Sequence, residues 1–114
     1  MGLTIEQIGA APLEVQKVAT PEWGGDGHCF IRTLTGAEMA VLQKLMKGAD
    51  EIRSSAAGVA FSLCDEGGKR LCGDDKESVD AILRAPMAPL MRCMNAVLSL
   101  NGLADDAVED AVKN

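Results

Sequence analysis

His28 and Cys29 are the neighbouring side chains whose types suggest catalysis, because a histidine base can activate a cysteine nucleophile. His28 is the only histidine of the chain, and it follows a glycine-rich segment, residues 24–27. Adjacent strand residues point to opposite faces, so the two side chains do not readily form the hydrogen bond that a catalytic pair needs. The glycine-rich segment lacks the Gly-Lys-Ser/Thr ending and the following helix of a phosphate loop. We therefore expect no catalytic residue and no enzymatic activity.

The cysteines are the other candidates for chemistry, here as metal ligands. They lie far apart in the sequence, at Cys29, Cys64, Cys72 and Cys93. A zinc finger or ribbon needs close pairs such as C-x2-C, which place two thiolates within reach of one ion. The acidic turn that begins at Asp65 lacks the acidic alternation and terminal glutamate of a calcium loop. We expect no metal and no cofactor, and four reduced, mostly buried thiols, as is usual in a cytosolic protein.

Length and composition indicate one small acidic domain. A chain of 114 residues that is 47% apolar can form a core without metal or disulfide support. One tryptophan and two phenylalanines are its only aromatic residues, so aliphatic side chains, methionine and alanine must fill that core. The net charge of −6, with no cluster of lysine and arginine, argues against binding to nucleic acid. No apolar run approaches the roughly 20 residues that a membrane span needs, and the start does not resemble a secretion signal.

The N-terminal third predicts a β-hairpin. Leu13 and Val15 alternate with polar residues, the period of a half-buried strand, and Thr20-Pro21 ends this strand. After the glycine-rich loop, residues 29–33 form the second, antiparallel strand of the hairpin. Before the hairpin, Thr4 and Gln7 form a capping box for one helical turn over residues 5–9.

The rest of the chain predicts helices. Thr35 and Glu38 form a second capping box, and in the helix that follows Met39, Leu42, Leu45 and Met46 fall on one face. Further helical patterns cover residues 52–63 and 89–100, and a weaker one follows residue 105. A short helix through residues 79–83 begins after a cap at Asp74 or Asp75. The sequence therefore predicts an α+β fold in one domain. A hairpin over residues 13–34 packs on a body of about four helices over residues 35–104, followed by a helical tail over residues 105–114.

Surface for binding a partner is the remaining source of function. Methionine is flexible and adapts to varied apolar partners, so the methionine-rich helices are candidates for an apolar groove. The alternative is that these methionines fill the core. The tryptophan has two interpretations as well: it fastens the hairpin to the helices, or it anchors a partner. The candidate partner-binding residues are Trp23, Met39, Leu42, Met46, Met87, Met91 and Met94.

Several segments resemble the tail assembly chaperones of long-tailed bacteriophages. Residues 18–25 read VATPEWGG and residues 30–38 read FIRTLTGAE, similar to the family's V-x-T-P-E-W-G and V-R-x-L-T-G-x-E. The turn LCDEGGKRL at residues 63–71, the acidic pair Asp74-Asp75 and LNGL at residues 100–103 extend the resemblance to residues 13–104. The loop at residues 26–28 is longer than in typical members, and the helix around residues 56–58 is richer in glycine and alanine.

The resemblance implies a chaperone without a catalytic site. Such proteins bind and solubilise the tape measure protein of a phage or prophage in the host bacterial cytoplasm, help to recruit tail tube subunits, and are absent from the mature virion. Many are also made as a longer, frameshifted product that contacts the tail tube protein. The ending Val112-Lys113-Asn114 is compatible with a slippery codon run. We expect a homo-oligomer, and the alternatives are a structural or completion component of a tail and a small regulatory binding module.

Overall fold

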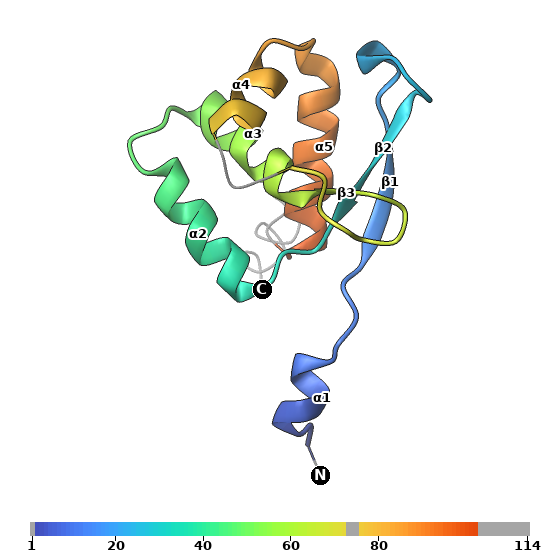
Figure 1. Ribbon diagram of the computed structural model, residues 1–114, viewed down its shortest axis with the longest axis vertical. Coiled ribbons are helices and arrows are strands. Elements are labelled where there is room, and N and C mark those ends of the chain that lie inside the picture. Colours follow the sequence, from blue (N-terminus) through green and yellow to red (C-terminus); the bar gives the residue numbers. More distant parts are fainter. Residues whose placement is uncertain (1, 73–75, 103–114) are drawn as a thin grey trace, which may run out of the picture.

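The computed structural model describes residues 2–72 and 76–102 and confirms the α+β class (Figure 1). A three-stranded antiparallel sheet lies on one side of α5, and α3 contacts α2, α4 and α5. The elements in chain order are α1 (Ile5–Gly9), β1 (Val15–Ala19), the 3-10 turn η1 (Pro21–Trp23), β2 (His28–Arg32), α2 (Gly36–Met46), α3 (Glu51–Ser62), β3 (Leu63–Cys64), α4 (Lys76–Leu83) and α5 (Met87–Leu100).

The predicted hairpin is present, and its register decides which strand residues face the helices. β1 pairs with β2 so that Val18 lies opposite Cys29, and β2 also pairs with the short strand β3. Cys29 contacts Cys93 of α5, so the face that carries Val18 is the inner face. The strand β3 was not predicted, because two residues are too short to show an alternating pattern.

The predicted burial of Leu13 and Val15 is wrong. These side chains are 39% and 37% exposed, whereas Val18 is 7% exposed. Positions three apart on a strand lie on opposite faces, so a strand that turns Val18 toward α5 turns Val15 away from it. The alternation predicted the strand correctly but its inner face incorrectly.

Local capping residues determine where three of the helices begin. The hydroxyl of Thr35 accepts the Glu38 amide at 3.1 Å and the Glu38 carboxylate accepts the Thr35 amide at 3.0 Å, as the capping box predicts. The same box, with Thr4 and Gln7, begins α1. Asp50 caps α3 by accepting the Arg53 amide at 2.7 Å. The candidate cap residues Asp74 and Asp75 and the predicted tail at residues 105–114 lie outside the described residues.

The core forms around α3, where residues 56–62 are all buried. Most of these side chains are small, which lets α5 pack closely. A methyl group at Gly58 would lie 3.5 Å from the sulfur of Met94, so this glycine faces α5 rather than solvent. By contrast, α1 has no buried residue and projects away from the body (Figure 1).

Candidate partner-binding surface

An apolar groove lies where the first turns of α3 and α5 meet. Its volume is about 240 Å³, and it is lined by Glu51, Ile52, Ser55, Met87, Leu90 and Met91. Ile52, Met87 and Met91 are 49%, 49% and 46% exposed, respectively, which is high for large apolar side chains that line one surface. We refer to these six residues as the Met87–Met91 groove.

The start of α5 explains why two methionines share this groove. Pro86 precedes the helix, and Pro89 fits its first turn because the first amides of a helix have no partner within the helix. Met87 and Met91 are one turn apart and so lie on the same side of α5. Leu90, between them, is 3% exposed and forms the floor of the groove.

The groove has the chemistry of a binding surface for apolar side chains. Among the described residues, Glu51 is the only charged one that lines the groove, and Ser55 donates its hydroxyl to the Glu51 carbonyl at 3.0 Å. The remaining walls are aliphatic or thioether groups, and the thioethers of Met87 and Met91 can adjust to differently shaped side chains. This arrangement can hold an apolar helix face.

The structure separates the other predicted partner-binding residues from this groove. Leu42 is only 3% exposed and belongs to the core, so it presents almost no surface to a partner. Met39, Met46 and Met94 are partly buried and pack against the core. The methionines predicted to bind a partner therefore divide between the surface (Met87 and Met91) and the edge of the core (Met39, Met46 and Met94).

Trp23 fastens the hairpin to the helices. Its indole Nε1 donates a hydrogen bond to the Pro86 carbonyl at 2.9 Å, immediately before α5. Next to it, the Arg92 guanidinium binds the Glu22 carboxylate and donates to the Ala19 carbonyl at 2.8 Å. The Arg92 hydrogen bond is the main reason that the pKa of Glu22 lies below its usual value. These contacts correspond to the first of the two interpretations of the tryptophan.

Replacing Trp23 with phenylalanine is expected to lower the free energy of unfolding by about 1 kcal/mol, because the hydrogen bond to the Pro86 carbonyl is lost. Urea unfolding followed by circular dichroism measures the change, since the variant has no tryptophan fluorescence. Glu22→Gln is the control, with a smaller expected loss because this ion pair is exposed. A larger loss in Glu22→Gln than in Trp23→Phe would contradict this assignment.

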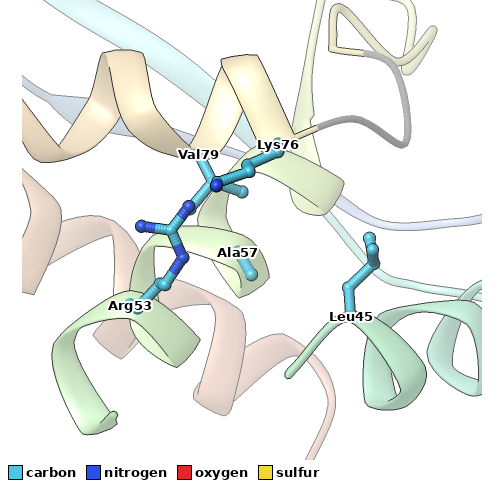
Figure 2. Close-up of a pocket in the computed structure, with 5 residues that line it drawn as sticks. All are labelled: Leu45, Arg53, Ala57, Lys76 and Val79. Carbon is cyan, nitrogen blue, oxygen red and sulfur yellow. The ribbon is translucent and has the colours of Figure 1, made fainter. Parts of the chain in front are cut away.

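A second pocket, of about 180 Å³, lies between α2, α3 and α4 and has a basic edge. Figure 2 shows Arg53 and Lys76 pointing toward one another, with Leu45 of α2 on the other side of the pocket. Arg53 donates to the Asp80 carboxylate at 2.6 Å, and this hydrogen bond lowers the pKa of Asp80 below its usual value. The pocket is smaller than the Met87–Met91 groove and shares no residue with it.

Sequence reasoning missed part of the exposed apolar surface. Leu45 was grouped on one apolar face with Leu42, yet Leu45 is 42% exposed and Leu42 only 3%, and Val41, one turn before Leu45, is 40% exposed. Ile52 was predicted only as part of a helical apolar pattern. Ile5 and Ile8 on α1 are 83% and 54% exposed. The sequence shows that Val41 and Leu45 are four residues apart and so lie on the same side of α2. It does not show that this side faces solvent.

His28 and Cys29 lie on opposite faces of β2, as strand geometry predicts. The His28 ring meets the Phe30 ring edge-on, with centroids 5.4 Å apart, while Cys29 faces α5. Among residues 2–72 and 76–102, no group of three or more potential metal ligands occurs, and no helix is long and apolar enough to cross a bilayer. Comparison of the chain with known protein families, curated proteins and solved structures finds no match.

Proposed function

We propose that this protein is a non-catalytic tail assembly chaperone of a long-tailed phage, which binds the tape measure protein in the host cytoplasm and keeps it soluble. The observation that carries the proposal is the Met87–Met91 groove, where three large apolar side chains are each nearly half exposed on an acidic protein. An exposed apolar patch of this kind is typical of a binding surface. The sequence resemblance supplies the identity of the partner.

The groove suits a partner that is long, helical and apolar. An amphipathic helix places its apolar side chains three or four residues apart, which allows one helix face to lie along Met87 and Met91. Each such contact is small and therefore weak, but several chaperone copies on one long partner hold it by multivalency. Weak single contacts also allow the tail tube protein to displace the chaperone as the tube grows.

The acidic surface supports the solubilising part of the proposal. With a net charge of −6, each bound copy adds negative charge to the complex, and mutual repulsion opposes aggregation. Leu3, Ile5 and Ile8 on the N-terminal arm are exposed and provide apolar contacts between neighbouring copies, in keeping with a homo-oligomer. A longer frameshifted product would add the contact to the tail tube protein, and the chaperone would leave before the virion is complete.

Co-expression with the tape measure protein encoded nearby tests the proposal. We expect the tape measure protein to be soluble only when this chain is present, and the two to co-purify. Mass spectrometry of purified virions should detect the tape measure protein but not this chain. The proposal is contradicted if the tape measure protein is equally soluble with and without this chain. If this chain is found in purified virions, a structural tail component is favoured instead.

A further inference from the structure

Two cysteines that are distant in the sequence meet between the sheet and α5. The sulfur atoms of Cys29, on β2, and Cys93, on α5, are 3.5 Å apart. All four cysteines are free thiols in this structure. Two sulfur atoms at this separation need to move by only about 1.5 Å to reach the bonding distance of a disulfide, so a local adjustment of side chains and backbone is enough.

The two thiols differ in exposure. Cys29 is partly exposed, near the glycine-rich tip of the hairpin, whereas Cys93 is completely buried. A reagent in solution therefore reaches Cys29 first, and Cys93 is placed to react only with the Cys29 sulfur, once that sulfur carries another group. This is the arrangement of an attacking thiol and a resolving thiol.

The hydrogen bond between the sulfurs favours the same division of roles. Its effect, aided by Thr20, lowers the pKa of Cys29 even though burial acts in the opposite direction. The same hydrogen bond and burial raise the pKa of Cys93. The thiolate is the reactive form of cysteine, so Cys29 is the better nucleophile of the pair.

We propose that Cys29 and Cys93 are a redox-sensitive modification site, which closes to an intramolecular disulfide when the protein meets a small disulfide such as oxidised glutathione. The Cys29 thiolate attacks one glutathione sulfur, and the other glutathione leaves as a thiolate. The Cys93 thiol then loses its proton and attacks the Cys29 sulfur, which releases the second glutathione. The protein loses two electrons and two protons, and oxidised glutathione is reduced to two thiols.

The disulfide fastens the hairpin covalently to α5. In the reduced protein, the Trp23 and Arg92 contacts and the hydrogen bond between the two sulfurs hold this junction without a covalent bond. A bond between residues 29 and 93 closes a long loop and restricts the unfolded chain, so the melting temperature should rise by about 10 °C. Neither cysteine lines the Met87–Met91 groove, so this inference does not depend on the proposed function.

Peptide mapping of the full chain tests the proposal. The reduced protein is incubated with oxidised glutathione, remaining thiols are alkylated, and the protein is digested with trypsin without reduction. Lysine and arginine separate the four cysteines, so each lies in a different tryptic peptide. We expect one linked pair, residues 18–32 joined to the peptide that begins at Cys93, together with an intact monomer that has lost two hydrogen atoms.

Single variants separate the two roles. Cys93→Ala should accumulate one glutathione on Cys29, because the resolving thiol is absent. Cys29→Ser should leave Cys93 unmodified, and Cys72→Ser, at a partly buried thiol on another segment, should form the disulfide as the parent chain does. A linked peptide that contains Cys64 or Cys72, a covalent dimer, or a parent chain that retains both thiols would overturn the proposal.

Discussion

A double variant with Met87→Glu and Met91→Glu is expected to lose the tape measure protein while keeping its own fold. Both side chains are about half exposed, so the free protein tolerates the charges. Glutamate near the start of α5 also interacts favourably with the helix dipole. In the complex, each carboxylate is buried against an apolar partner without a hydrogen-bond donor, at a cost of about 1–3 kcal/mol. We therefore expect binding to a soluble tape measure fragment to weaken by about 100-fold.

The matched control is the double variant Val41→Glu and Leu45→Glu. These residues are also one turn apart, on α2, and are 40% and 42% exposed. The control changes the net charge by the same amount but does not touch the Met87–Met91 groove. Circular dichroism and melting temperature check that both variants fold. If the control loses the partner and the groove variant retains it, the binding face is on α2 and our assignment of the groove is wrong.

The parts of the fold that depend on neighbouring residues could be predicted from the sequence. The capping boxes at Thr4 and Thr35 involve residues three positions apart, and the structure contains both. The inner face of β1 could not be predicted, because it depends on where α5 lies. The alternation of side chains along a strand shows which residues share a face of the sheet. Which of the two faces α5 covers becomes clear from a contact between residues 64 positions apart, Cys29 and Cys93.

The candidate site could be predicted only in part for the same reason. Met87, Met91 and Met94 look equivalent in the sequence, and all three were named. The rotation of α5 against α3 separates them, because it turns Met94 toward Gly58 and leaves Met87 and Met91 at the surface. Ile52 completes the groove from α3, and no local pattern links it to residues on α5.

The electrostatic junction between the sheet and α2 was also invisible in the sequence. Arg32, at the end of β2, is 6% exposed, and its guanidinium binds the carboxylate of Glu38 on α2. Glu38 thus has two functions, since it also completes the capping box with Thr35. A third group, Arg70, lies 4.0 Å from the same carboxylate. The capping-box pattern predicted that Glu38 accepts the Thr35 amide. It did not predict that Glu38 is also the counter-ion of a buried arginine.

Glu38→Gln is expected to lower the free energy of unfolding by about 2 kcal/mol at pH 7. Glutamine can still accept the Thr35 amide, so the capping box remains. The loss arises because the buried Arg32 charge is left without its counter-ion, which is costly in a poorly solvated position. Glu66→Gln, on an exposed turn, makes the same change in charge and should alter stability by less than about 0.5 kcal/mol. Equal effects of the two substitutions would show that net charge, rather than the Arg32 contact, is responsible.

The difference between the parent chain and Glu38→Gln should disappear in acid. Burial alone would raise the pKa of Glu38, but the Thr35 amide and the Arg32 charge outweigh it and hold the pKa below the ordinary value of 4.5. A carboxylate whose pKa is lower in the folded state stabilises the fold at pH values above the unfolded pKa. That contribution is lost as the pH falls through the folded pKa, because both states then bind the proton. Urea unfolding of both proteins between pH 7 and pH 3 measures this, and a difference that stays constant over the range would contradict the role of the ion pair.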